Sequence, residues 1–174
     1  YHTLEHLTHL FAQFEQIEQY LYEPHIIALA LYYHDVIYEP TRTDNELQSA
    51  EYAVEALGHY LSAEQCQHIY ALIVMTASHQ LDELADSKKI SDAAYLLDMD
   101  LSILGSVWSN YEKYAQAVRQ EYSHVPITDY RTGRIKVLAG LLAHPRLYLT
   151  DYYFERMEAH ARDNIKREIS LLLC

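Results

Sequence analysis

The feature that most constrains the fold is an apolar segment that ends in a histidine-aspartate pair, His34-Asp35. The segment runs from Ile26 to Tyr38, and apart from this pair its residues are apolar or tyrosine. A helix that is apolar on every face belongs in a core. An ionised carboxylate placed there costs on the order of several kcal/mol unless it is paired or binds a cation. The fold must therefore bring a partner for this pair from another part of the chain.

The rest of the chain predicts an all-α fold. It contains 4 Gly and 4 Pro in 174 residues, and no segment alternates with the period of a strand. Thr43 with Glu46 and Ser62 with Gln65 have capping-box spacing, so each pair is expected to open a helix. Periodicity and caps predict helices over about 3–22, 24–39, 43–58, 62–78, 91–105, 106–122, 130–143 and 150–173, with a loop over 80–89 and a possible break at Gly105. The expected architecture is one compact helical domain over 1–174.

The bulk composition limits the partners of the protein. Its 13 basic and 25 acidic residues give a net charge of −12, which repels the phosphate backbone and argues against nucleic-acid binding. A phosphate substrate would need a local cation to offset this field. No apolar run reaches the roughly 18 residues that a membrane span needs. Two cysteines, Cys66 and Cys174, make no disulfide framework, so a cytoplasmic location is expected.

Two other segments offer partners for the His34-Asp35 pair. On a helical wheel His6 lies about 70° from the apolar stripe of its helix, whereas His9 lies over about 100° away. In the segment 96–105, Asp98 and Asp100 flank the apolar stripe on opposite sides, and Asp100 is nearer to its centre. Two histidines and two aspartates from three segments could close one metal site. Helical geometry favours Asp100 and leaves Asp98 as the alternative.

The combination of these segments resembles the HD-domain superfamily of metal-dependent phosphohydrolases. The resemblance covers most of the chain and is nearest to a subgroup of small bacterial proteins known only as predicted phosphohydrolases. The segments that carry it are Tyr1-His2-Thr3-Leu4-Glu5-His6, His34-Asp35-Val36-Ile37-Tyr38, Asp44-Asn45-Glu46-Leu47-Gln48-Ser49-Ala50 and 97–105. The fold it implies is an HD-domain-like helical bundle.

The resemblance also implies a site. Its metal ligands would be His6, His34, Asp35 and Asp100. Mixed imidazole and carboxylate ligands suit Mn, Fe, Co, Ni or Zn. The expected reaction is metal-assisted hydrolysis of a small phosphate ester, possibly a nucleotide, in which Asp35 or Glu46 accepts the proton of water.

Histidine 79 and several basic residues are further candidates for the site. His79 ends the fourth predicted helix, where it could contact phosphate, bind a second metal or simply cap the helix. Glu46, named above as a possible proton acceptor, could instead serve only to cap the helix that it begins. Candidate phosphate donors are Arg42, Lys88, Lys89, Arg131, Arg134 and Arg162.

Three other functions remain open from the sequence. His2-Thr3-Leu4-Glu5-His6 fits the H-x-x-E-H pattern of zinc proteases, but it leaves the buried His34-Asp35 pair unexplained. A di-iron oxygenase of the HD type would need more ligands, and His79 and His2 are the obvious spares. A non-catalytic ligand-binding module could retain the metal for structure alone.

Overall fold

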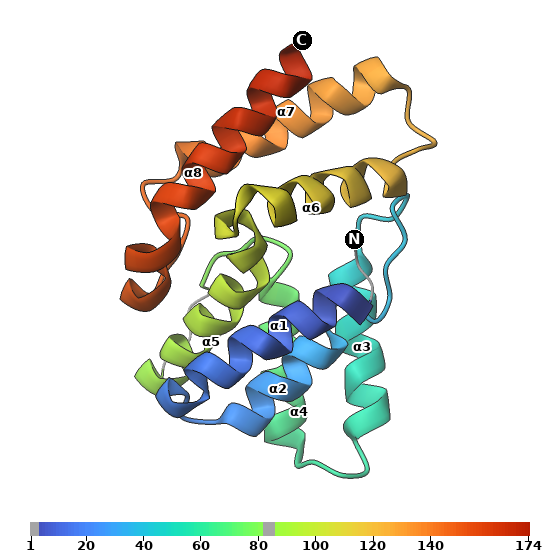
Figure 1. Cartoon of the computed structure of the whole chain (residues 1–174). Coiled ribbons are helices and arrows are strands. Elements are labelled where there is room, and N and C mark those ends of the chain that lie inside the picture. Colours follow the sequence, from blue (N-terminus) through green and yellow to red (C-terminus); the bar gives the residue numbers. More distant parts are fainter. Residues whose placement is uncertain (1–3, 82–85) are drawn as a thin grey trace. The chain divides into compact units, whose positions relative to one another are not determined.

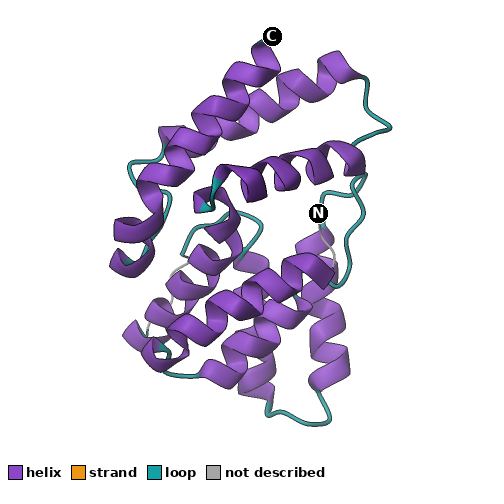
Figure 2. Cartoon of the chain, viewed as in Figure 1, coloured by secondary structure: helices purple, strands orange, loops and turns teal. Residues whose placement is uncertain are grey.

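The computed structural model describes residues 4–81 and 86–174, and these residues form helices, turns and loops without a strand (Figures 1 and 2). The predicted all-α fold class is therefore confirmed for the described residues. The chain divides by its internal contacts into an N-terminal unit that ends at Asp100 and a C-terminal unit, Leu101–Cys174. Each unit is described by itself below, and the single domain expected over 1–174 stays a prediction.

The N-terminal unit carries the candidate metal ligands. Its elements are α1 (Leu4–Ile17), the 3-10 helix η1 (Glu18–Tyr20), α2 (Pro24–Tyr33), α3 (Asn45–Leu57), α4 (Ala63–Met75) and α5 (Ser87–Asp100). Helix α2 packs against α1, α3, α4 and α5, which makes it the centre of the unit (Figure 1). Four of its residues are buried, namely Ile26, Ile27, Ala30 and Leu31. These four residues form the core-facing side of α2, whereas Tyr32 is 53% exposed, so the helix is only partly buried although its sequence is apolar on every face.

The C-terminal unit consists of η2 (Leu101–Gly105), α6 (Trp108–Glu121), α7 (Ile127–Ala143) and α8 (Asp151–Leu173). Helix α8 packs on η2, α6 and α7. Gly105 permits the close approach to α8, since a Cβ at this position would lie 2.6 Å from the Cβ of Met157. A break follows Gly105 as expected, but the α-helix predicted to reach 105 already ends at Asp100, and Leu101–Gly105 forms a 3-10 helix.

Several predicted helix ends differ from the structure. The first helix stops at Ile17 and continues only as η1, and the second stops at Tyr33 instead of reaching Pro40. The predicted capping box of Thr43 is wrong, because Asp44 is the N-cap of α3 and makes no side-chain cap. The capping box of Ser62 and Gln65 is confirmed by both of its hydrogen bonds.

Two later helices begin earlier than the pattern indicates. Helix α5 starts at Ser87, so the C-terminal part of the predicted loop is helical, and residues 82–85 of that loop lie outside the described residues. Asp86 explains the early start, since its carboxylate accepts hydrogen bonds from the backbone N–H groups of Lys88 and Lys89. Helix α7 starts at Ile127, directly after Pro126. Proline fixes its own φ and disfavours helix in the residue before it, so it sets this start.

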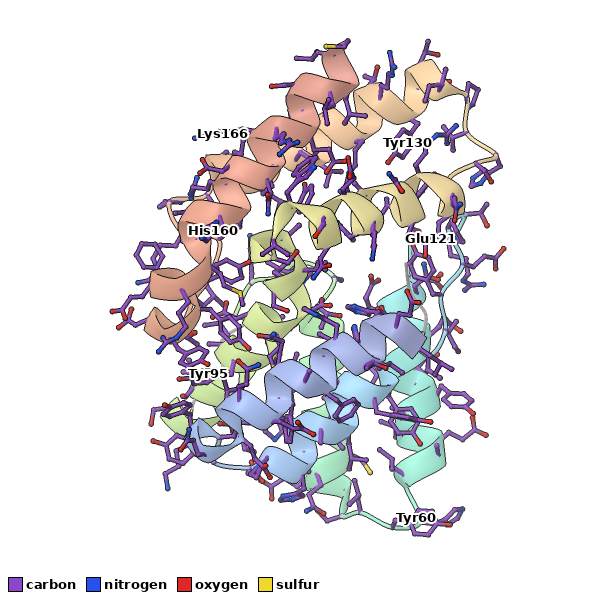
Figure 3. The ribbon with its side chains drawn as sticks, viewed as in Figure 1. Tyr60, Tyr95, Glu121, Tyr130, His160 and Lys166 are labelled. Atoms are coloured by element: carbon purple, nitrogen blue, oxygen red, sulfur yellow. The ribbon has the colours of Figure 1, made fainter. Side chains whose placement is uncertain are left out.

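The 17 tyrosines serve both the cores and the surface. Tyr111, Tyr148 and Tyr153 are completely buried in the C-terminal unit, whereas Tyr60, at the turn between α3 and α4, is 83% exposed (Figure 3). Within residues 4–81 and 86–174, no helix combines the length and the apolar character needed to cross a membrane.

Candidate metal centre

The His34-Asp35 pair lies where α2 ends. His34 is the C-cap of this helix, and its backbone N–H still donates to the carbonyl of Ala30. Asp35 follows in a turn, while the backbone of His34 itself is still helical. The Oδ2 atom of Asp35 lies 2.9 Å from Nε2 of His34, so the two side chains are in contact with each other.

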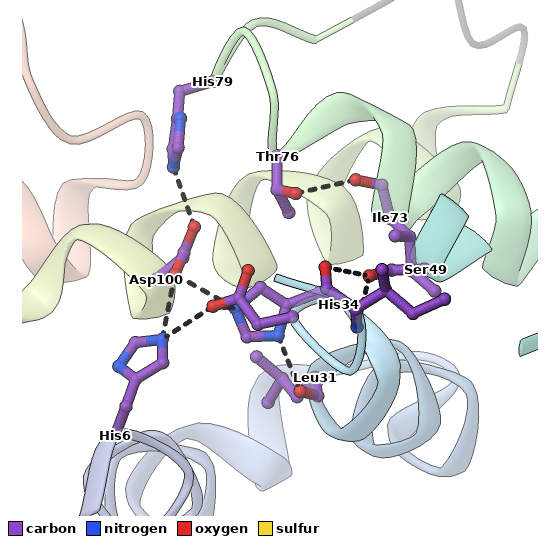
Figure 4. Close-up of polar contacts among 10 residues, drawn as sticks. His6, Leu31, His34, Ser49, Ile73, Thr76, His79 and Asp100 are labelled. Carbon is purple, nitrogen blue, oxygen red and sulfur yellow. Dashed lines mark hydrogen bonds and ion pairs between the residues drawn. The ribbon is translucent and has the colours of Figure 1, made fainter. Parts of the chain in front are cut away.

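The imidazole of His34 is held by the backbone. Its Nδ1 lies 2.7 Å from the carbonyl oxygen of Leu31, a position in which Nδ1–H donates the hydrogen bond (Figure 4). This bond leaves Nε2 as the atom that faces the cluster. A metal-binding histidine generally has such a partner on its other ring nitrogen, because the partner fixes the tautomer and the ring plane.

Helix α3 holds the segment that follows the pair. The hydroxyl of Ser49 accepts from the N–H of Ile37 and donates to its carbonyl, at 3.1 Å each. The side-chain amide of Asn45 makes the same double contact with the backbone of Glu39, at 3.0 Å each. Both polar side chains are buried. These two pairs of hydrogen bonds position the turn that carries Asp35, and no pattern in the sequence signals the role of Ser49.

Four side chains from three helical segments converge on one point, as predicted. His6 comes from α1, His34 and Asp35 from the end of α2, and Asp100 from the last residue of α5 (Figure 4). Each imidazole lies near both carboxylates: His6 Nε2 is 3.5 Å from Asp35 Oδ2 and 3.5 Å from Asp100 Oδ1, and His34 Nε2 is 3.4 Å from Asp100 Oδ1. All four donor atoms lie within 4.8 Å of one another.

This donor set could hold a metal ion. Two ligand atoms that each lie about 2.0–2.2 Å from one ion are about 2.9–3.6 Å apart when they subtend right or tetrahedral angles. The four nitrogen-to-oxygen distances run from 2.9 to 3.5 Å and fall within that interval. The side chains of His6 and His34 are 2% exposed, whereas those of Asp35 and Asp100 are 20% and 15% exposed. The histidines therefore form the inner wall, and solvent reaches the site from the carboxylate side.

The four side chains of the cluster shift one another's pKa values. Burial works against every charged form here, but the neighbouring groups outweigh it. The carboxylates raise the pKa of His34 well above its usual value and that of His6 less strongly, while the two histidines hold the pKa values of Asp35 and Asp100 below the usual range. Both aspartates are thus ionised at neutral pH. The raised pKa values of the histidines mean that protons compete with a metal ion for the two imidazoles, so metal binding at this cluster would release protons.

The structure separates the other candidates from this cluster. His9 is half-buried on α1 and lies outside the cluster, as its wheel position predicted. Asp98 is 1% exposed but does not belong to the cluster, so the preference for Asp100 is supported by the geometry.

Glu46 lies in the first turn of α3, and none of the contacts that join the four ligands involves it. His2, on which the H-x-x-E-H alternative depends, lies outside the described residues.

His79 reaches the cluster through Asp100. Its Nε2 lies 2.9 Å from Oδ2 of Asp100, while Oδ1 of the same carboxylate faces His6 and His34 (Figure 4). His79 follows the C-terminus of α4, and its backbone has a positive φ of 51°, a left-handed conformation that costs a non-glycine residue roughly 1–3 kcal/mol. The N–H of His79 bonds to the carbonyl of Met75 and closes the helix end. The strained residue therefore directs its imidazole onto a ligand, which the helix pattern alone does not reveal.

Replacing His79 with alanine is expected to weaken metal binding by about 10- to 100-fold, because residues that orient a metal ligand typically contribute that much. Metal titration by calorimetry measures the effect. The control is His59→Ala, which removes an exposed histidine just after α3. Unchanged affinity with slower turnover would instead make His79 a substrate contact. Two metal ions bound per wild-type chain and one per variant would make it a ligand of a second ion.

No family model, curated protein or solved structure matches this chain.

Proposed function

We propose that the protein is a metal-dependent phosphohydrolase of the HD-domain type that hydrolyses a small phosphate ester such as a nucleotide. The observation that carries the proposal is the convergence of His6, His34, Asp35 and Asp100 on one point that is open to solvent on its carboxylate side. The resemblance of the segments around these ligands to HD-domain phosphohydrolases supports the same assignment. So does the order of the ligands along the chain, in which a histidine of α1 is followed by a His-Asp pair at the end of α2 and by an aspartate at the end of α5.

The residues have distinct tasks in this proposal. His6, His34, Asp35 and Asp100 would hold the ion, with His34 fixed by Leu31 and Asp100 by His79. A bound divalent transition metal polarises a phosphoryl oxygen and lowers the pKa of its water to about 7. Asp35 is the more exposed of the two carboxylates, so we assign it the hydrogen bond that orients the attacking water. Glu46, three residues before Ser49, is the alternative proton acceptor.

Hydrolysis is expected to require the metal. The test removes metal from the purified protein with a chelator, restores Mn, Fe, Co, Ni or Zn one at a time, and measures phosphate release from a panel of nucleotides and other phosphate esters. We expect turnover that is lost on chelation and returns with at least one of these ions, and that falls by at least about 100-fold in the Asp35→Asn variant.

Other results would select other functions. Turnover that survives exhaustive chelation would contradict a metal-dependent mechanism. Full metal occupancy without turnover of any ester would favour the non-catalytic ligand-binding module. Two irons per chain with a visible absorption band would favour the di-iron oxygenase.

A further inference from the structure

We propose that a pocket of the N-terminal unit, separate from the candidate metal centre, binds a free α-amino acid. The residues that line this pocket come from α4 and from the starts of α2 and α5, namely Glu23, Ser62, Glu64, Gln65, His68 and Lys89. Its volume of about 340 Å³ lies within the range of roughly 300–1,000 Å³ that is usual for small-molecule sites. None of the four candidate metal ligands is among the lining residues. A ligand bound here would therefore serve a function beyond hydrolysis.

The imidazole of His68 is the lining group that lacks a hydrogen bond. Its side chain is 5% exposed, and Nε2 has no hydrogen-bond partner within the described residues. Nδ1 lies 3.5 Å from Oε2 of Glu23, beyond the roughly 2.7–3.2 Å of an ordinary N–H···O hydrogen bond. Burial lowers the pKa of His68, and the charge of Lys89 lowers it further, so the ring is neutral at neutral pH. A buried polar ring without a bond is costly, and a ligand that donates to it would relieve this cost.

Glu23 provides a negative charge beside this imidazole. It is the N-cap residue of α2, but its side chain makes no capping hydrogen bond. Within the described residues, the contact of its carboxylate is the one with His68. A carboxylate and an unprotonated imidazole nitrogen both accept hydrogen bonds, and an ammonium group has three N–H donors that can serve them together. Glu23 and His68 thus form an end of the pocket that suits an ammonium group.

The start of α4 provides donors for a negative charge. In the capping box, Oγ of Ser62 and Oε1 of Gln65 each accept from a backbone N–H, which leaves the hydroxyl proton and the amide N–H groups of these side chains free of the box. Nζ of Lys89 lies 3.2 Å from Oε1 of Glu64 and has two further N–H donors. The partial positive charge of a helix N-terminus also favours a carboxylate at this end.

The two ends of the pocket identify the class of ligand. His68 follows Gln65 by three residues, so the ends lie on one face of α4, about 4.5 Å apart along its axis. Two glutamates against one lysine give the lining a charge of −1, which disfavours a simple anion. A simple cation would leave the donors at the helix start unused. An α-amino acid carries its ammonium and its carboxylate on one carbon atom, so it can form charge-assisted hydrogen bonds at both ends.

Calorimetric titration of the full chain with each proteinogenic amino acid, one at a time, tests the binding. We expect at least one of them to bind to one site per chain with a Kd below about 1 mM. Its N-acetyl derivative lacks the ammonium and its methyl ester lacks the carboxylate, so each should bind at least about 10-fold more weakly. Failure of every amino acid to bind would overturn the proposal. A methyl ester that binds as tightly as the free amino acid would also overturn it, in favour of a simple cation site.

Two matched pairs of variants locate the binding. Glu23→Gln and Lys89→Met remove one charge from each end of the pocket, whereas Glu18→Gln and Lys88→Met remove exposed charges that do not line it. The first two should each weaken binding by at least about 10-fold, and the second two should leave it within about 2-fold. Glu23→Gln should fold, because the side chain of Glu23 does not cap α2. Equal effects of the pocket variants and their controls would contradict binding in this pocket.

Nuclear magnetic resonance provides an independent readout at His68. Its ring protons should shift when the amino acid binds, because the ligand donates to the imidazole, while those of the exposed His59 should stay in place. Asp35→Ala removes a candidate metal ligand and should leave the affinity for the amino acid unchanged, since Asp35 does not line the pocket. Binding that disappears in this variant, without a shift at His68 in the wild type, would place the amino acid on the metal and overturn the proposal.

Discussion

Replacing Asp35 with alanine is expected to abolish stoichiometric metal binding. Its Oδ2 atom lies 2.9 Å from Nε2 of His34, closer than Oδ1 of Asp100 at 3.4 Å, and it lies 3.5 Å from Nε2 of His6. Loss of an orienting residue around a metal costs about 10- to 100-fold in affinity, so loss of a ligand should exceed this range. Metal content after gel filtration, together with calorimetric titration, measures the change.

The matched control for this variant is Asp44→Ala, in the same segment between α2 and α3. Asp44 binds the exposed Arg42 and lies outside the cluster, so its variant should keep full metal occupancy. Both variants should fold, because Asp35 and Asp44 are each partly exposed. An Asp35→Ala protein that retains one metal ion per chain would refute the assignment of this ligand.

The second large effect distinguishes Asp100 from Asp98. Asp100→Asn is expected to reduce metal affinity by more than about 100-fold, whereas Asp98→Asn should stay within about 3-fold of the wild type. Asp100 faces the two imidazoles and is oriented by His79, while Asp98 is buried on the same helix outside the cluster. Asparagine is chosen at both positions because it keeps the size of the buried side chain. Titration of the folded variants with Mn or Zn gives the comparison, and the opposite order of affinities would transfer the ligand role to Asp98.

Helical periodicity predicted the burial of His6 but not that of the two aspartates of α5. The wheel position of His6 beside its apolar stripe predicted a side chain that reaches the interior, and the residue is 4% exposed. The wheel also placed Asp100 nearer to the interior than Asp98, and this was wrong, because Asp98 is 1% exposed while the side chain of Asp100 is 15% exposed. An amphipathic pattern fixes which face is buried, but it does not rank two polar residues at the border of that face.

The contacts that orient the ligands were not predictable in this way. Helix α2 ends at Tyr33 within an apolar run that carries no glycine or proline to mark the end. Ser49 and Asn45 hold the following turn by bonds to the backbone of Ile37 and Glu39, and such contacts depend on how α3 packs rather than on sequence spacing. The bond from His79 to Asp100 joins residues 21 positions apart and depends on a left-handed backbone at a non-glycine residue. The reaction and the family assignment remain proposals.

The most direct test of the central claim is the location of a metal ion in crystals of the protein grown with Mn or Zn. Anomalous diffraction at the absorption edge of the metal should show one peak about 2.0–2.2 Å from Nε2 of His6, Nε2 of His34 and one oxygen each of Asp35 and Asp100. The same experiment on the Asp35→Ala variant should show no peak at this place. A strong anomalous peak elsewhere, with none between these four side chains, would contradict the metal centre on which the proposed function depends.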